Sequence, residues 1–270
     1  MEFKLNAYLK RLNLNEAVSC DEIGLDVLQK HHFYTVPFEN LSMHMEEGVS
    51  YQLNEVYKKI VLNNRGGNCF EMSILMAKAL SELGFVFEPR LARVHLVDPI
   101  SAATHQIFVV SIEKKRWILD IGFGAKGPRG PLLLESGFVQ KRDYTWTKVE
   151  KSDRYGWIIS ILENPKQNEE WEQIYSFYDQ YTTDEDIEAA QFFVTHAKTS
   201  LLKMNCVVSL PTETGRLSIR NGMFIEASND AISTQEFNCS DALKALLSQR
   251  FNLDLNSPPL QPSTLKRNFE

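Results

Sequence analysis

The 270-residue sequence has no apolar run that approaches the roughly 20 residues needed to cross a bilayer. Its first residues, MEFKLNAYLKRLNL, lack the apolar segment of a secretory signal and have instead the periodicity of an amphipathic helix. The four cysteines (Cys20, Cys69, Cys206 and Cys239) are far apart and form no CxxC pair, as is typical of reduced thiols in a cytosol. We therefore expect a cytoplasmic protein without a membrane partner.

The sequence also lacks an excess of positive charge. Lysines and arginines number 29 against 35 acidic residues, which gives a net charge of −6. A mildly acidic protein has no general electrostatic attraction to nucleic acid. No GxxxxGK[ST] loop is present, and no His, Cys or carboxylate residues have the close spacing of metal ligands. We expect neither a nucleic-acid partner nor a metal, and the pattern leaves the oligomeric state unknown.

No internal repeat or long linker divides the chain, but its sequence pattern changes from helical to strand-like at residue 85. The first 85 residues have mainly helical patterns, and the clearest helix follows Arg65-Gly66-Gly67 and ends near Gly84. Short segments rich in β-branched and aromatic residues come next. Strands are expected at 85–97, 105–112, 116–123, 155–162, 175–178, 205–210, 216–220 and 223–228, helices at 182–193 and 240–249, and a loose tail at 257–263. This order predicts an α+β fold.

Cys69 is the cysteine whose surroundings favour reactivity. Gly66 and Gly67 allow a sharp turn just before it, and the helix that begins there presents unpaired N–H groups with partial positive charge. This setting favours the thiolate, which is the reactive nucleophile, and the same N–H groups could hold a developing oxyanion. Taken alone, the pattern fits an inert buried cysteine about as well as a nucleophile.

A nucleophilic cysteine needs a base, and the base needs an orienting group. Of the six histidines, His105 opens a strand, and Asp120 lies in the apolar strand that follows, where a carboxylate requires a partner. If the turn between these strands is centred on Lys114-Lys115, Val109 faces Asp120, and His105 shares that face about 13 Å along the strand. A bulge, a shifted register or a longer turn must then bring His105 to Asp120. On these residues alone, an ordinary sheet histidine stays possible.

Four motifs together resemble the arylamine N-acetyltransferase family. They are TVPFENL at residues 35–41, RGGNCFE at 65–71, the strand that begins at His105, and LDIGFG at 119–124, in the family's order and at similar spacing. The match is specific over about residues 30–135 and weak after that. The resemblance implies a cysteine-protease-like catalytic core in three parts: an N-terminal helical bundle (1–85), a central β-barrel (86–190) and a C-terminal α/β lid (191–270).

The same resemblance implies a chemistry and its residues. It implies a catalytic triad of Cys69, His105 and Asp120. Acetyl-CoA is the implied co-substrate and an aromatic amine or hydrazine the implied acceptor, in a ping-pong order through an acetyl-cysteine. The family's acceptor pocket corresponds here to Phe38, Val94 and Phe123, whose flat apolar faces suit an aryl ring but also fit ordinary core.

Two motif residues are expected to support the site, and three stretches depart from the family pattern. Glu39 and Arg65 are expected to pair and to hold the loop around Cys69. Asn68 stands where an aromatic is usual, Ser73 stands where an asparagine is usual, and the segment from Gln191 to Ser200 lacks the family's proline. Because that last segment borders the pocket in relatives, the sequence assigns no coenzyme-binding residue and leaves the acceptor preference open.

Three other functions remain compatible with the same residues. A Cys–His–Asp site also serves cysteine peptidases and transglutaminase-like proteins, in which water or a protein amine attacks the acyl-enzyme. A binding protein could keep the scaffold without the chemistry. An amide synthase could use a different acyl donor.

Overall fold

The computed structural model describes residues 2–45, 48–237, 240–253 and 255, so Cys239 and the predicted tail at 257–263 lie outside the described residues. The helices are α1 (Leu5–Arg11), α2 (Glu22–Thr35), α3 (Leu41–His44), α4 (Leu53–Tyr57), the π-helical turn η1 (Lys58–Leu62), α5 (Cys69–Leu83), α6 (Asp184–His196), α7 (Leu201–Met204) and α8 (Ser240–Phe251). The strands are β1 (Phe38–Glu39), β2 (Val86–Val94), β3 (Ala103–Ile112), β4 (Lys115–Leu119), β5 (Leu132–Leu133), β6 (Val139–Lys141), β7 (Thr145–Ser152), β8 (Gly156–Glu163), β9 (Glu172–Phe177), β10 (Val207–Thr212), β11 (Gly215–Arg220), β12 (Met223–Ser228) and β13 (Ile232–Glu236). The α+β class is confirmed.

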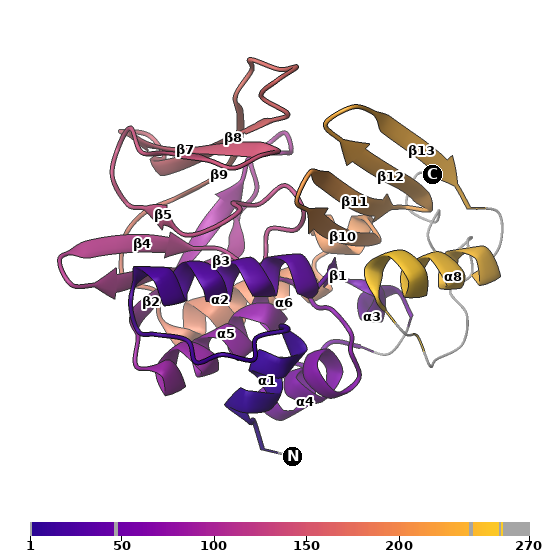
Figure 1. The fold of residues 1–270 in the computed structure, drawn as a ribbon, viewed down its shortest axis with the longest axis horizontal. Coiled ribbons are helices and arrows are strands. Elements are labelled where there is room, and N and C mark those ends of the chain that lie inside the picture. Colours follow the sequence, from indigo (N-terminus) through magenta and orange to yellow (C-terminus); the bar gives the residue numbers. More distant parts are fainter. Residues whose placement is uncertain (1, 46–47, 238–239, 254, 256–270) are drawn as a thin grey trace.

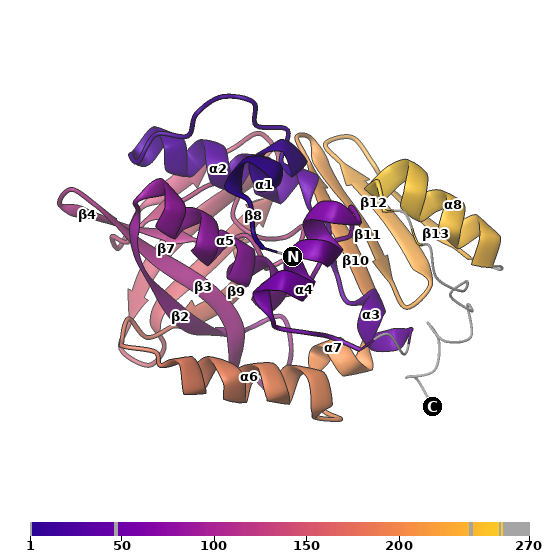
Figure 2. The ribbon, with the colours of Figure 1, turned by 90° about the horizontal axis from the view of Figure 1, so that it is seen from below.

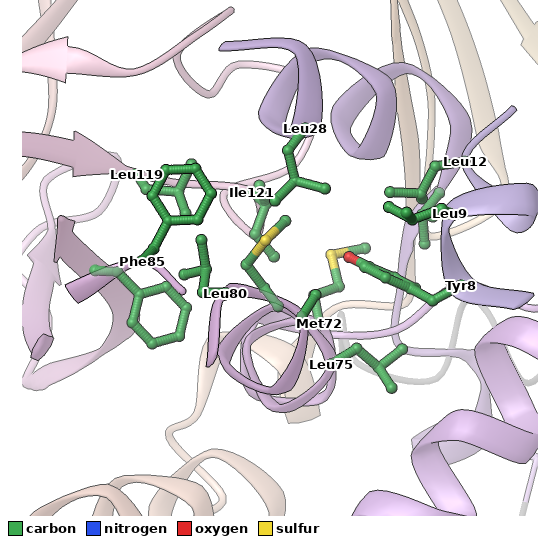
Figure 3. Close-up of a cluster of buried hydrophobic side chains, with 14 of the residues drawn as sticks. Tyr8, Leu9, Leu12, Leu28, Met72, Leu75, Leu80, Phe85, Leu119 and Ile121 are labelled. Carbon is green, nitrogen blue, oxygen red and sulfur yellow. The ribbon is translucent and has the colours of Figure 1, made fainter. Parts of the chain in front are cut away.

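Helix α5 is the centre of the N-terminal helical part. It ends, as expected, at Gly84, whose φ of +84° is the left-handed conformation that glycine adopts without strain. Met72, Leu75 and Leu80 on α5 pack in one core cluster with side chains of α1 and α2 and of the barrel segment around Leu119 (Figure 3). This shared core holds the start of α5, and therefore Cys69, in a fixed place against the strands.

The middle of the chain forms the expected β-barrel. Eight strands pair in the order β5-β4-β3-β2-β9-β8-β7-β6, all antiparallel, and the sheet curls around its own apolar interior (Figure 1). Inward side chains of neighbouring strands, such as Val109, Ile118 and Ile159, fill that interior. Strands β8 and β9, which pair with each other, agree with the strands predicted at 155–162 and 175–178.

The C-terminal part is a second sheet with a helix on one face. Its order is β1-β10-β11-β12-β13, and α8 packs Leu243, Leu247 and Phe251 against it (Figure 1). Strand β1 comes from the N-terminal third, with Phe38 opposite Ser209, so this sheet joins both ends of the chain. Helix α6 contacts β3 and leads into α7, at the lower edge of the molecule in Figure 2. The residue-level boundaries at 85 and 190 remain predictions, and the second falls inside α6.

The β3–β4 hairpin corrects one expectation. The turn is Glu113-Lys114 rather than Lys114-Lys115, so Val109 faces Ile118, and the strand ends at Leu119 before Asp120. This register reduces the offset between His105 and Asp120 from four residues to two.

Other corrections concern elements that the sequence pattern did not reveal. The sequence pattern predicts none of the strands β1, β5, β6, β7 and β13, and the helical segment that begins at Leu53 changes to a π-helical turn after Tyr57. Among the described residues, no helix combines the length and the hydropathy that a membrane span requires.

Candidate active site

Cys69 is the first residue of α5, and its neighbours fix the helix start. The Asn68 side chain accepts hydrogen bonds from the backbone N–H groups of Phe70 (3.0 Å) and Glu71 (3.2 Å), while the Glu71 carboxylate accepts one from the Asn68 N–H at 2.9 Å. This reciprocal capping box explains how an asparagine serves at a position where the family usually has an aromatic. The sulfur of Cys69 is thereby held at the positive end of a 15-residue helix.

The loop after β4 packs directly against Cys69. A Cβ atom at Gly122 would lie 2.7 Å from the Cα of Cys69, so a side chain at this position would push the two segments apart. The N–H of Gly122 donates to the Asp120 carboxylate at 3.0 Å. The glycine of the LDIGFG motif is therefore what lets the Asp120 loop approach the cysteine.

His105 and Asp120 are in contact. His105 Nε2 and Asp120 Oδ2 are 2.9 Å apart, and both residues are buried. A β-bulge precedes His105: Ala92 faces His105 and Arg93 faces Ala103, so Thr104 is the extra residue. Bulges re-aim side chains, and the carbonyl oxygen of Thr104 lies 3.9 Å from the sulfur of Cys69. The shifted register and the bulge together close the distance that the predicted pairing left open.

The pKa of His105 is strongly perturbed. Burial by itself would lower it, but the negative charge of Asp120, their hydrogen bond and a hydrogen bond with the Cys69 sulfur raise the pKa to about 10. Because Asp120 occupies Nε2, Nδ1 is the ring nitrogen left for the sulfur. This arrangement favours a protonated imidazole beside Cys69 at neutral pH.

Four buried or nearly buried charges lie under the loop that carries Cys69. Glu39 and Arg65 pair at 2.9 Å, which confirms the expected contact. The sequence did not reveal Lys59, whose ammonium lies 2.8 Å from Glu71 and 3.7 Å from Glu39. Burial would raise the pKa of Glu39, but Lys59 and Arg65 hold it below its usual value. This network ties β1, η1 and α5 together.

Cys69 and His105 open onto one cavity of about 730 Å³. Its lining includes Cys69 and His105 and all three predicted pocket residues, Phe38, Val94 and Phe123. The divergent segment also contributes, through Phe193, Val194, Thr199 and Ser200. Of the six histidines, His105 is the one that lines this cavity.

Tyr175 is a site residue that the sequence placed in a strand without assigning it a role. Its ring packs against His105 (5.4 Å between centroids) and Phe123 (5.3 Å). Burial, together with the negative charge of Asp120, raises the pKa of its phenol. Only the pairing of β9 with β2 brings it here, so no local signal could have revealed it. Within the described ranges, no group of three or more potential metal ligands is found.

Comparisons with known proteins agree with this geometry. A family model described as N-acetyltransferase matches residues 24–259. The arylamine N-acetyltransferase of Escherichia coli (strain K12) is 27% identical over 258 residues, which span 93% of this chain and 89% of that protein. The solved arylamine N-acetyltransferase of M. tuberculosis superposes with a TM-score of 0.84 at 26% identity over 93% of both chains. That of Mycobacterium marinum in complex with CoA has a TM-score of 0.86 at 23% identity over 97% of both chains, a likeness of fold.

Proposed function

Because this chain belongs to the arylamine N-acetyltransferase family, we propose that it transfers an acetyl group from acetyl-CoA to an aromatic amine or hydrazine. One observation supports the proposal above the others: Cys69 and His105 line the same cavity, and Asp120 holds the far nitrogen of His105 at 2.9 Å. These three residues are the proposed catalytic triad. The cytoplasm is the proposed location, supported by the free thiols of Cys20, Cys69 and Cys206.

In the first half-reaction, the sulfur of Cys69 attacks the thioester carbonyl of acetyl-CoA. A bond forms between this sulfur and the acetyl carbon, the bond from that carbon to the coenzyme sulfur breaks, and the coenzyme thiolate takes the proton of the His105 imidazolium. Asp120 keeps the imidazole in the orientation that presents Nδ1 to the sulfur. Exchange of one thioester for another is nearly balanced in free energy.

In the second half-reaction, the amine nitrogen attacks the acetyl-cysteine. His105, now neutral, takes a proton from the amine, the new amide bond forms, and the Cys69 sulfur leaves as thiolate. Phe38, Val94 and Phe123 would hold the aryl ring against this centre, since their side chains line the cavity. Amide formation is downhill, so positioning of the amine and exclusion of water are what the cavity must supply.

Incubation with acetyl-CoA tests the two half-reactions separately. Without acceptor, we expect one acetyl group per protein, located on the Cys69 peptide by mass spectrometry. With an aromatic hydrazine, we expect continuous release of CoA and an acetylated product. Cys69→Ser should lose both signals, whereas Cys20→Ser, which changes an exposed thiol, should keep both.

The alternatives give different results in the same assay. Continuous CoA release without any amine would indicate hydrolysis, and acetylation of lysine peptides in preference to the hydrazine would indicate a transglutaminase-like reaction. No adduct on Cys69 would favour a binding protein, and an adduct from malonyl-CoA alone would indicate another acyl donor. Each of these outcomes would overturn the proposal.

A further inference from the structure

The cavity that holds Cys69 is mainly apolar, but one fixed positive charge stands at its edge. Arg220, the last residue of β11, is the single lysine or arginine among the described lining residues, and Asp98 is the single carboxylate. Arg220 is exposed, so its guanidinium reaches solvent as well as the cavity. A lone guanidinium at the mouth of an apolar cavity attracts an anionic group of whatever binds there.

The orientation of Arg220 is fixed by a buried residue. Its Nε donates to Asn205 Oδ1 at 3.0 Å, and the same oxygen accepts from Asn221 Nδ2 at 3.1 Å. Asn205 is itself buried and donates to the backbone carbonyl of Leu201 at 2.9 Å. Among the described residues, no hydrogen bond or ion pair engages the two terminal nitrogens of Arg220. These nitrogens form an oriented fork of the kind that binds phosphate.

The strand ladder gives the backbone spacing between Arg220 and the segment that precedes Cys69. Gly67, two residues before Cys69, bridges to Phe38 of β1; β1 pairs with β10, and Val207 of β10 faces Arg220 of β11. Three strand spacings separate the backbone at Gly67 from that at Arg220, a lateral span of about 14 Å. A simple arylamine or hydrazine carries no anionic group for Arg220 to bind, whereas a coenzyme A thioester carries phosphates. The long pantetheine arm of a coenzyme thioester separates its phosphates from the acyl carbon by many bonds.

We infer that Arg220 binds a phosphate group of the acyl donor's coenzyme and thereby selects donors that carry one. This inference rests on the proposed function, because it assumes a coenzyme thioester as donor. It assigns Arg220 to donor binding and leaves the reacting atoms to Cys69 and His105. Arg220 is therefore a specificity residue, and its loss should change the KM for the donor rather than kcat.

The test compares two donors with one acceptor. For Arg220→Gln, we expect the KM for acetyl-CoA to rise about tenfold, which corresponds to the loss of one charge-assisted hydrogen bond. We expect kcat to change little. For S-acetyl-N-acetylcysteamine, a thioester without phosphates, we expect no change. Arg220→Lys keeps the charge but loses the planar fork. Its KM for acetyl-CoA should therefore lie between that of wild type and that of Arg220→Gln. The matched control is Lys198→Gln, which removes an exposed cation beside the lining residue Thr199 without touching the cavity, and should leave both KM values unchanged.

The outcomes separate this inference from the proposed function. Binding of free CoA, measured by calorimetry, requires no catalysis. The affinity of Arg220→Gln for CoA should be about tenfold weaker than that of wild type. Equal CoA affinity in the two proteins overturns the inference while acetyl transfer continues. A defect confined to acceptors with a carboxylate, such as 4-aminobenzoate, also overturns it, because Arg220 would then bind the acceptor. A wild-type protein that binds CoA but acetylates no arylamine contradicts the proposed function alone.

Discussion

Two buried histidines in this protein have opposite acid–base properties. His32 on α2 is fully buried, and its Nδ1 lies 2.7 Å from the hydroxyl of Tyr8; burial and the positive charge of Arg11 lower its pKa to about 3. His105 is almost as deeply buried, yet its pKa is raised to about 10. The difference is the charge of the nearest partner, a neutral phenol in one case and the carboxylate of Asp120 in the other.

The comparison shows that burial alone does not distinguish a structural histidine from a reactive one. His32 lies within the N-terminal helices, where a neutral imidazole fills space and makes one hydrogen bond. His105 lies between a carboxylate, a sulfur and a cavity, where the charged imidazole is stabilised. The comparison therefore predicts that changes at the first site affect stability and changes at the second affect catalysis.

Asp120→Asn should have the largest effect. An asparagine cannot stabilise the imidazolium and can hold the imidazole in the wrong tautomer, so we expect kcat/KM for acetyl transfer to fall by about 10³–10⁴. Steady-state kinetics with acetyl-CoA and an aromatic hydrazine measures this, and circular dichroism checks that the variant is folded. If Asp120→Asn keeps more than a tenth of the wild-type activity, the partner charge does not set the role of His105.

The residues of the candidate site could be named from the sequence, but their distances could not. The motifs around Cys69, His105 and Asp120 point to the three side chains that the structure brings together. The turn that sets their register depends on Glu113, whose φ of +53° is an uncommon conformation for a residue other than glycine and has no sequence signature. This shift of two residues, together with the bulge at Thr104, replaces the predicted separation of about 13 Å along the strand with a hydrogen bond.

Other parts were missed because their signals are tertiary. Strand β7 buries Thr145 and Thr147 at positions where a half-buried strand usually has apolar residues, so its sequence lacks the apolar alternation that predicts a strand. Lys59, Tyr175 and Arg220 reach the site only through packing or strand pairing of distant segments.

At acid pH, the lowered pKa of His32 should destabilise the fold. The pKa of His32 is lower in the folded protein than in the unfolded chain, so the unfolded state binds more protons as the pH falls below 6.5, and stability is lost. Between pH 6.5 and about pH 4.5, wild type should lose about 2 kcal/mol more unfolding free energy than His32→Asn, which keeps an acceptor for Tyr8 but does not titrate. Urea unfolding of both proteins across this range measures it. Parallel curves would show that the fold does not lower the pKa of His32.

At alkaline pH, the raised pKa of His105 should have the opposite effect on the pH dependence of stability. The pKa of His105 is higher in the folded protein than in the unfolded chain. Its contribution to the free energy of unfolding is therefore complete below pH 6.5 and is lost as the pH rises toward 10. Asp120→Asn removes the main cause of the raised pKa, but the contribution of the Cys69 sulfur remains. Between about pH 7 and pH 9, wild type should therefore lose about 2 kcal/mol more free energy of unfolding than this variant. An equal slope for the two proteins would contradict the assignment.

The smallest effect is expected from Tyr8→Phe, the mildest change at the structural histidine. It removes the hydroxyl that contacts Nδ1 of His32 and leaves a buried ring nitrogen without its partner, which should cost about 1–2 kcal/mol of unfolding free energy. The acetyl-transfer rate at neutral pH should stay within twofold of wild type, because the Tyr8–His32 pair does not line the cavity of Cys69. A loss of kcat comparable to that of Asp120→Asn, in a variant that remains folded, would mean that the two histidines are coupled, and the division between a structural and a reactive imidazole would fail.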